Sequence, residues 1–304
     1  MMKPVPGELD RIETIRRLAG SARGSRVVLG IGDDCAIYRP RDSAEDLLFT
    51  TDLLIEDIHF RRDGHPAEAV GHKALARGLS DIAAMGGVPR FCLVSLALAP
   101  WSGTRWMKSF YRGLLALAAE SGTVLAGGDL AHAAAVTCDI VVCGAVPRGT
   151  ALRRDGAKAG DGIYVSGRLG ASALGLARRR GRAWQRHLRP EPRLALGRFL
   201  RERLQATAAM DLSDGISLDL HRLCRASGVA ASIGVPPVFR GATLEQALHG
   251  GEDYELLFTV RRGTRVPTVY RGLELTRIGE IRRGTPGKVL LDGEPLPALG
   301  YDHF

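Results

Sequence analysis

The sequence predicts an α+β fold divided into two domains. Three observations lead to this expectation: a globular composition, short apolar strands that alternate with amphipathic helices, and a polar stretch near the middle of the chain. Of the 304 residues, 45% are hydrophobic, 25% charged and 6% aromatic, which excludes a disordered or collagen-like chain. Since domains typically hold ~100–200 residues, this length predicts two of them.

The first half is expected to form a mixed or antiparallel sheet with helices on one face. Its longest helix is expected at residues 66–85, where apolar residues recur at helical spacing and Gly86 and Gly87 end the pattern. A strand at residues 123–126 is expected to end in a turn at Gly127, Gly128 and Asp129. The remaining elements are helices at 9–20 and 103–121 and strands at 26–30, 46–54, 91–98 and 136–146.

The stretch at residues 147–162 is polar, glycine-rich and basic, and it predicts the domain boundary. We therefore expect one domain at residues 1–148 and a second at residues 149–304. The second should contain strands at 163–166, 208–212, 229–235 and 254–260, helices near 170–180, 193–206, 215–227 and 244–248, and weak strands at its end.

The formal net charge of +9 fits a polyanionic partner: nucleic acid, an anionic membrane or a phosphorylated small molecule. Ten arginines and only two acids lie between residues 178 and 203. We interpret this run as a solvated helix surface, and we expect no nucleic-acid or membrane partner, because no RNA- or DNA-binding motif accompanies it. Five scattered cysteines without a CxxC pair, and an N-terminus without an apolar leader, predict a cytoplasmic protein without disulfides.

Five acidic clusters stand at strand ends or in glycine turns of this basic chain: Asp33 with Asp34, Asp52, Asp81, Asp129, and Asp211 with Asp214. Carboxylates gathered in one place repel one another unless cations intervene. Magnesium prefers such oxygen ligands, usually together with substrate phosphates. One cluster alone is explained by a turn with a local hydrogen bond, but five in similar contexts favour a site that binds magnesium and phosphate.

Other phosphate-handling and hydrolytic classes are excluded by their missing motifs. The chain has no GxxxxGK[ST] loop, no kinase HRD and DFG motifs, and no GxGxxG turn between a strand and a helix. It also lacks HExxH, zinc-type cysteine and histidine spacings, and GxSxG.

Six blocks, in this order and spacing, resemble the thiamine-monophosphate kinase family. They are GIGDDCAI at residues 30–37, TTDLLIEDIHF at 50–60, KALARGLSDIAAMGGVP at 73–89, GGDL at 127–130, MDLSDGISLDL at 210–220 and GGEDYELLFT at 250–259. The closing GYDHF at residues 300–304 is also similar to the end of that family's sequences. The resemblance thus spans nearly the whole chain.

The resemblance implies magnesium-dependent transfer of the γ-phosphoryl group of ATP to thiamine monophosphate, giving thiamine diphosphate and ADP. It implies several Mg²⁺ ions in one site and ATP as co-substrate. The implied fold is PurM-like, with an N-terminal mixed sheet that pairs with a second copy into a barrel-like homodimer core, and a C-terminal α/β sandwich. We expect direct in-line transfer, because a phosphate monoester is already ionised near pH 7 and needs no strong base.

The resemblance also implies roles for individual residues. The implied magnesium ligands are Asp34, Thr50, Thr51, Asp52, Asp81, Asp129, Asp211 and Asp214, of which Asp81, Asp129 and Asp214 are the expected catalytic residues. Nucleotide contacts fall on Tyr111, Gly128, Asp129 and Ser213, and substrate contacts on His59, Glu252 and Tyr301. Thr150 stands where the family tends to place an ATP-contacting arginine, and we expect Arg153 or Arg148 to replace it. The alternative role of Asp33 is to form the turn. The alternative role of Asp253 is to fix the turn at Gly250 and Gly251.

Two alternatives remain at this stage. A sister ATP-dependent synthetase, similar to selenophosphate or aminoimidazole ribonucleotide synthetase, would use another acceptor. A non-enzymatic RNA-binding protein would use the arginine-rich segment, but that reading leaves the aspartate turns unexplained.

Overall fold

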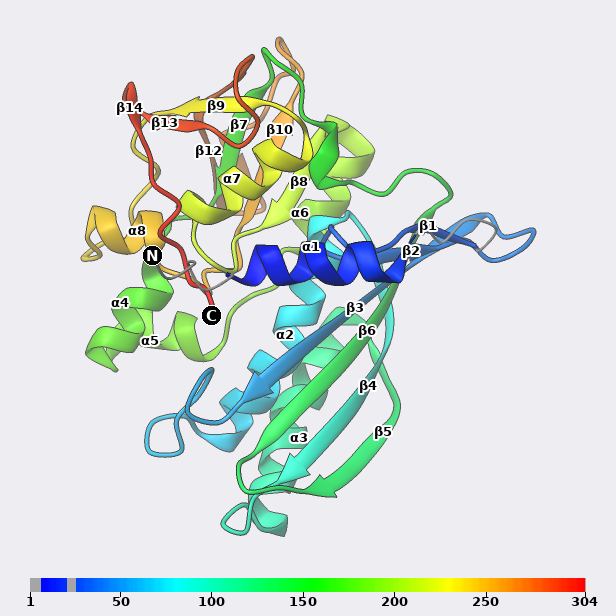
Figure 1. Cartoon of the computed structure of the whole chain (residues 1–304). Coiled ribbons are helices and arrows are strands. Elements are labelled where there is room, and N and C mark those ends of the chain that lie inside the picture. Colours follow the sequence, from blue (N-terminus) through cyan, green and yellow to red (C-terminus); the bar gives the residue numbers. More distant parts are fainter. Residues whose placement is uncertain (1–6, 21–25, 304) are drawn as a thin grey trace, which may run out of the picture.

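The computed structural model describes residues 7–20 and 26–303, which form two lobes, each built on one β-sheet (Figure 1). The expectation for the N-terminal leader concerns in part residues 1–6, and the last residue of the closing motif is Phe304. Both lie outside the described residues.

The N-terminal lobe holds a six-stranded mixed sheet in the order β1-β2-β3-β6-β4-β5. Only β4 and β5 run parallel among these pairs. Helices α2 (Ala67–Ala84) and α3 (Thr104–Ser121) cover one face of the sheet (Figure 1). The strands are β1 (Val27–Leu29), β2 (Ala36–Tyr38), β3 (Glu45–Ile55), β4 (Val88–Leu98), β5 (Val124–His132) and β6 (Thr137–Pro147).

Helix α2 is the central element of the molecule, and most of its residues are buried. It packs closely on α3 because both helices carry a glycine at the crossing: a Cβ on Gly71 would lie 1.9 Å from the carbonyl oxygen of Phe110, and one on Gly113 would lie 1.8 Å from that of Glu68. On its other side α2 contacts strand β8 and helix α6 of the second lobe. One helix therefore carries side chains to the junction of the two lobes.

The C-terminal lobe holds an eight-stranded mixed sheet, with strand order β14-β13-β9-β12-β7-β10-β8 and β11 paired to β12. Its faces are both covered: α7 packs on one side, and α6 with the π-helical turn after it packs on the other. The strands are β7 (Gly162–Ser166), β8 (Ala208–Asp211), β9 (Ala230–Ile233), β10 (Leu256–Val260), β11 (Val269–Tyr270), β12 (Leu273–Arg282), β13 (Val289–Leu291) and β14 (Glu294–Pro295). The helices are α4 (Ala171–Arg178), α5 (Gly181–Leu188), α6 (Leu194–Phe199) continued by the turn Leu200–Leu204, α7 (Ile216–Ala226) and α8 (Leu244–His249).

Most expected elements are confirmed within a few residues, and the mixed α and β architecture is confirmed. Three details differ: β2 and α5 were not anticipated, and β5 does not end at its glycines. It continues to His132 because Gly128 lets the strand approach β4 closely; a Cβ there would lie 1.9 Å from the oxygen of Val94. Neither sheet closes into a barrel in the described residues.

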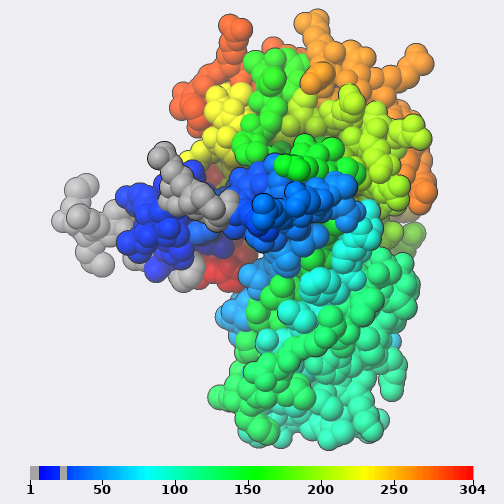
Figure 2. Space-filling model, turned by 90° about the vertical axis from the view of Figure 1, so that its right-hand side faces the viewer, coloured from blue at the N-terminus to red at the C-terminus, as the bar shows by residue number. Residues whose placement is uncertain are grey.

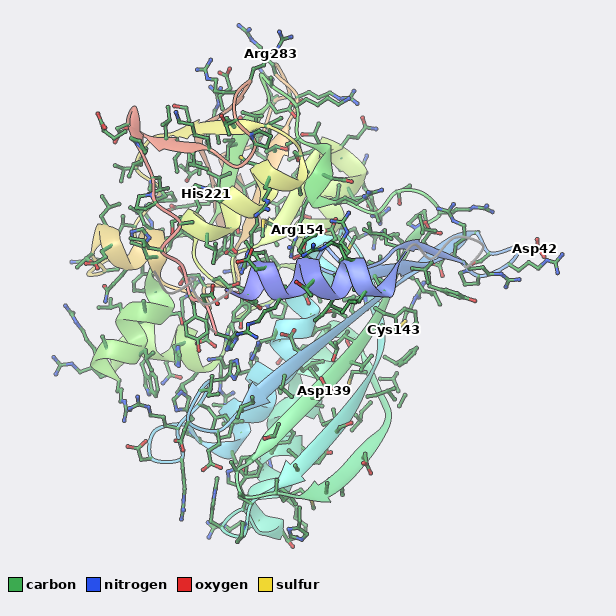
Figure 3. All side chains as sticks on the ribbon, in the orientation of Figure 1. Asp42, Asp139, Cys143, Arg154, His221 and Arg283 are labelled. Carbon is green, nitrogen blue, oxygen red and sulfur yellow. The ribbon has the colours of Figure 1, made fainter. Side chains whose placement is uncertain are left out.

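Helix α1 (Glu8–Ala19) lies between the two lobes, as the blue segment in the space-filling view shows (Figure 2). It has no buried residue, so the lobes do not depend on it for a core. No described helix combines the length and the apolar character needed to cross a membrane. All five cysteines are buried and free, including Cys143 of the N-terminal sheet (Figure 3), which confirms the absence of disulfides.

The arginine-rich segment is used within the chain. Six of its ten arginines form ion pairs: Arg179, Arg186, Arg189, Arg193, Arg198 and Arg201. Arg186 and Arg193 both form ion pairs with Glu255, a fully buried residue that directly precedes β10. Arg186 and Arg193 therefore have a structural role, whereas seven of the ten arginines are exposed, as the expected solvated surface requires.

Candidate functional site

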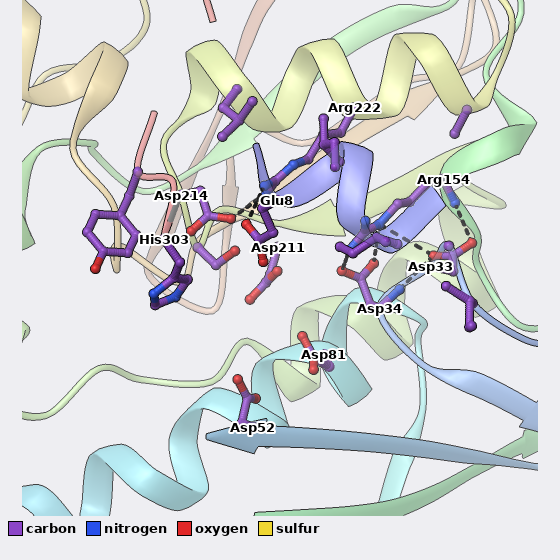
Figure 4. Close-up of a pocket in the computed structure, with 18 of the residues that line it drawn as sticks. Glu8, Asp33, Asp34, Asp52, Asp81, Arg154, Asp211, Asp214, Arg222 and His303 are labelled. Carbon is purple, nitrogen blue, oxygen red and sulfur yellow. Dashed lines mark hydrogen bonds and ion pairs between the residues drawn. The ribbon is translucent and has the colours of Figure 1, made fainter. Parts of the chain in front are cut away.

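A pocket of about 2190 Å³ lies where the two lobes meet, and it collects most of the residues singled out in the sequence (Figure 4). Twelve of them line it: Asp33, Asp34, Thr50, Thr51, Asp52, His59, Asp81, Asp211, Ser213, Asp214, Glu252 and Tyr301. They come from both lobes and from the C-terminal tail, so folding brings together positions up to 268 residues apart.

Three carboxylates form the centre of this pocket. One oxygen each from Asp34, Asp81 and Asp211 lies within 4.8 Å of the other two. Asp34 belongs to the turn between β1 and β2, Asp81 to α2, and Asp211 to the end of β8. Such a convergence of oxygen donors from three elements fits a hard divalent cation.

Hydroxyl groups hold two of these carboxylates in place. Ser80 Oγ donates to Asp211 Oδ2 at 2.6 Å, which ties α2 to the second lobe. Thr50 Oγ1 donates to Asp81. Burial, together with the neighbouring carboxylates, raises the pKa of Asp81 and of Asp211 well above the ordinary value. The group therefore resists full ionisation unless positive charge enters the pocket.

Asp34 of this centre and two further carboxylates at the pocket are each paired with an arginine. Arg154 binds Asp34, Arg222 binds Asp214, and Arg77 Nη2 lies 3.0 Å from Asp52 Oδ1. Arg154 lies where the two lobes meet (Figure 3). The phosphates of a nucleotide would thus meet guanidinium groups as well as carboxylates in this pocket.

Asp33 also lines the pocket and supports the turn that carries Asp34. Its side chain accepts a hydrogen bond from the backbone N–H of Asp34 at 3.0 Å and another from that of Arg154 at 3.1 Å. Burial and the charge of Asp34 raise its pKa to about 7. Asp33 thus forms the turn and joins it to residue 154.

Glu252 lies at the other end of the pocket in a buried network. Lys73 Nζ, almost fully buried on α2, lies 2.6 Å from Glu252 Oε1. Burial alone would raise the pKa of Glu252, but Lys73 first, with His187 and Arg77, lowers it to about 2. Glu252 is therefore held as a carboxylate, a group that suits a cationic ligand.

The segment around Glu252 is conformationally strained. Glu252 and Tyr254 have φ values of 64° and 50°, in the left-handed region that non-glycine residues rarely adopt. Hydrogen bonds to Ser213 and Leu212 hold the two residues there. Asp253 does not fix the preceding glycines; it accepts hydrogen bonds from the backbone N–H groups of Gly170 and Ser172 at the start of α4.

His59 presents a defined tautomer to the same end of the pocket. Its Nδ1 accepts a hydrogen bond from the backbone N–H of Ile55 at 3.0 Å, so Nε2 carries the proton. That Nε2 is buried and has no acceptor in the described part of the chain. The ring of His303 lies 5.3 Å away, between centroids, on the C-terminal tail.

The C-terminal tail closes one side of the pocket. The backbone N–H of Tyr301 donates to the oxygen of Asp214 at 2.9 Å, and the Tyr301 ring lies edge-on against His303. The backbone N–H of Glu8, the first residue of α1, donates to the carboxylate of Asp302. Figure 4 shows Glu8 and His303 facing the carboxylates from this side.

Other expected residues do not reach the pocket of the single chain. They are Tyr111, which packs on the core of the N-terminal lobe, Gly128 and Asp129, which lie on β5, and Arg148 and Arg153. Arg153 pairs with Asp155, whereas its neighbour Arg154 enters the pocket. Since residues 153 and 154 are both arginines, the sequence carries no signal that distinguishes them.

Sequence reasoning also missed Lys73, Arg77, Arg222 and Tyr254. The first two had a usable signal: Lys73, Arg77 and Asp81 recur every four residues and so share one face of α2. A row of charged residues on an otherwise buried helix predicts that this face of the helix borders a cavity. Arg222 and Tyr254 had no comparable signal, because their partners lie in distant segments.

Comparison with known proteins agrees with this geometry. The family model for AIR synthase related protein, N-terminal domain, matches residues 32–149. The chain is 38% identical to the thiamine-monophosphate kinase of Salmonella typhimurium over 95% of its length and 97% of that protein, and 35% identical to that of Bacillus subtilis over 92% and 94%. The solved structure of AaThiL complexed with AMPPCP and TMP superposes with a TM-score of 0.87 at 32% identity, covering 100% of this chain and 99% of that one.

The fold and the site together define a protein whose N-terminal lobe is an AIR synthase related domain, with a carboxylate-rich pocket between its two lobes. Within that class, the chain belongs to the thiamine-monophosphate kinase family, which is a family of enzymes. The resemblance seen in the sequence blocks is thereby confirmed.

Proposed function

We propose that this protein transfers the γ-phosphoryl group of ATP to thiamine monophosphate, giving thiamine diphosphate and ADP in a magnesium-dependent reaction. The observation that carries the proposal is the convergence of Asp34, Asp81 and Asp211 in a pocket whose far end holds Glu252. One end suits phosphates with a divalent cation, and the other suits the cationic thiazolium ring.

The residues present fit magnesium. Three carboxylates from three elements converge, and two of them have strongly raised pKa values that added positive charge would lower. Asp34, Asp81 and Asp211 would hold the ion, with Asp52, Asp214 and the Thr50 and Thr51 oxygens beside them. The bound ion would neutralise phosphate charge and help to align the two substrates.

The chain's own residues then orient the two substrates and neutralise part of their phosphate charge. We propose that Arg154, rather than Arg153, contacts the nucleotide phosphates, because Arg154 is the one that lines the pocket. Glu252, His59 and Tyr301 bind the acceptor. No general base is needed, since the attacking phosphate oxygen is already ionised near pH 7. Transfer is direct and in line, and a stable phosphoprotein after incubation with ATP alone would contradict it.

The experiment is chromatography of thiamine esters after incubation with ATP and thiamine monophosphate, with and without Mg²⁺. Magnesium-dependent thiamine diphosphate with stoichiometric ADP supports the proposal. ATP consumption without thiamine diphosphate would instead indicate a sister synthetase with another acceptor.

We further propose that residues 1–148 and 149–304 are the two domains, that the protein acts in the cytoplasm, and that it is a homodimer joined through the open face of the N-terminal sheet. That face carries exposed apolar side chains at Leu53, Leu93 and Val124. Asp129 lies on it too: its cross-strand partners are Ser95, then Asp139, then Leu53.

Asp129 and Asp52 therefore cannot bind one cation within a single chain. Asp52 precedes Leu53 and so points to the opposite face, toward α2, and three strand spacings separate the two residues, or about 14 Å. We propose that a second copy brings its Asp129, with Gly128, to the pocket. Mixing inactive Asp81→Asn with inactive Asp129→Asn should restore about a quarter of the activity, because half of the dimers are mixed and each has one intact site. No recovery in subunits shown to exchange contradicts this arrangement.

A further inference from the structure

Helix α2 carries three charged residues in a row, of which Arg77 and Asp81 line the pocket and Lys73 is buried beside it. Lys73, Arg77 and Asp81 follow one another at intervals of four residues on one face of the helix. With a rise of 1.5 Å per residue, Arg77 stands about 6 Å along the axis from each neighbour. Asp81 belongs to the carboxylate centre and Lys73 to the Glu252 network, so Arg77 lies midway between the two ends of the pocket.

The guanidinium of Arg77 is only partly satisfied by the chain. Its Nη2 binds Asp52 and its Nη1 donates to the oxygen of Leu53 at 3.1 Å. Its Nε is buried and has no acceptor among the described residues. Nε and Nη2 form the edge of the guanidinium that grips an oxyanion in a two-pronged contact, and Asp52 occupies only one prong.

Two donors in this half of the pocket that are unpartnered among the described residues favour a ligand with acceptor atoms at this position. The second unpartnered donor in this half of the pocket, His59 Nε2, is neutral: burial first, and then the charge of Arg77, lower the pKa of His59 to about 4. A buried donor without an acceptor is costly, so two such donors lining one pocket point to a ligand that supplies acceptors.

We infer that Arg77 is the positioning residue for the phosphate group of the acceptor. This inference rests on the proposed function, because it takes the thiamine end of the acceptor to lie at Glu252. An acceptor held there extends its phosphate along α2 toward the carboxylate centre and meets Arg77 on the way. The nucleotide phosphates, held near Arg154 and Asp34, approach from the other side.

The test compares ligands that differ only in the phosphate. Binding of thiamine monophosphate and of thiamine is measured by calorimetry in the presence of AMPPCP and Mg²⁺, for the wild type, Arg77→Gln and Arg77→Lys. Arg77→Gln should bind thiamine monophosphate at least about tenfold more weakly, with thiamine and AMPPCP unchanged. Arg77→Lys keeps the positive charge beside Asp52. Its affinity for thiamine monophosphate should fall several-fold, because an ammonium group cannot make the two-pronged contact. The control is Arg168→Gln, which removes a half-exposed arginine paired with Glu274, away from the pocket.

Other outcomes overturn the inference. Equal losses for thiamine and its monophosphate would mean that Arg77 only shapes the pocket, and weaker AMPPCP binding would assign Arg77 to the nucleotide. If the folded wild type binds no thiamine monophosphate, the proposed function fails. Arg77 is then judged with inorganic phosphate, whose binding Arg77→Gln should abolish and whose unchanged binding would refute the inference by itself.

Discussion

Lys73 and Glu252 form a buried ion pair, with 2.6 Å between Nζ and Oε1, across the junction of the two lobes. Lys73 also donates to the backbone oxygen of His59 at 3.3 Å. One lysine thus links α2, the loop that carries His59, and the strained segment before β10. The acceptor end of the pocket is built around this pair.

Removing the lysine alone should therefore weaken the fold. Lys73→Met leaves the Glu252 carboxylate buried without its main partner, and we expect the free energy of unfolding to fall by about 2 kcal/mol. Urea denaturation at neutral pH measures it. The double variant Lys73→Met with Glu252→Gln should regain most of the lost stability, because no unpaired charge is then buried. A double variant as unstable as the single one would show that packing, not charge, is what was lost.

Asp81→Asn should separate stability from activity. It removes one of three mutually repelling carboxylates, so in EDTA at pH 8 the variant should be more stable than the wild type by about 1 kcal/mol. Turnover should fall by at least about a hundredfold, because the cation loses a central ligand. Asp155→Asn, which removes an exposed carboxylate paired with Arg153, serves as the control and should change neither property. Destabilisation in EDTA or full turnover would contradict the assignment.

The two neighbouring arginines should behave differently. Arg154→Gln should raise the KM for ATP by at least about tenfold, because it removes a charge-assisted contact at the carboxylate centre. Arg153→Gln should leave that KM within about twofold, since its partner Asp155 lies outside the pocket. Steady-state kinetics at saturating thiamine monophosphate distinguish them, and the reverse pattern would return the role to Arg153.

His187 predicts a dependence of stability on pH. Burial first, and then the charge of Lys73, lower the pKa of His187 from 6.5 to about 3. Below pH 6.5 the unfolded chain binds a proton that the folded chain does not, so this contribution is complete above pH 6.5 and is lost as the pH falls. Between pH 7 and pH 5 the wild type should lose about 2 kcal/mol relative to His187→Gln.

The comparison with His187→Gln is necessary because buried carboxylates act in the opposite sense. Burial raises the pKa of Asp219 to about 7, so folded protein binds protons there as the pH falls and gains stability. Chemical denaturation at several pH values isolates the histidine contribution as a difference. Parallel curves for the two proteins would mean that His187 titrates normally in the folded state.

Much of the fold and part of the site followed from the sequence alone. Periodicity placed α2 and α3 within one residue at each end, because long amphipathic helices carry a strong repeating signal. Short elements such as β2, with three residues, carry too little pattern to be detected. The strand β5 was cut short because two glycines usually mark a turn, whereas here they permit close contact with β4.

The sequence by itself determined which residue types carry the chemistry: six ordered blocks, with aspartates beside glycines, identified the family and most of the pocket residues. Tertiary structure alone decided which of those aspartates share one site. Asp34, Asp81 and Asp211 converge because α2 bridges the two lobes. Asp129 faces away because side chains alternate along a strand, and two strands lie between β5, which carries it, and β3, which carries Asp52. Adjacent positions such as Arg153 and Arg154 look alike in a sequence, and only the direction of the backbone in space assigns one of them to the pocket.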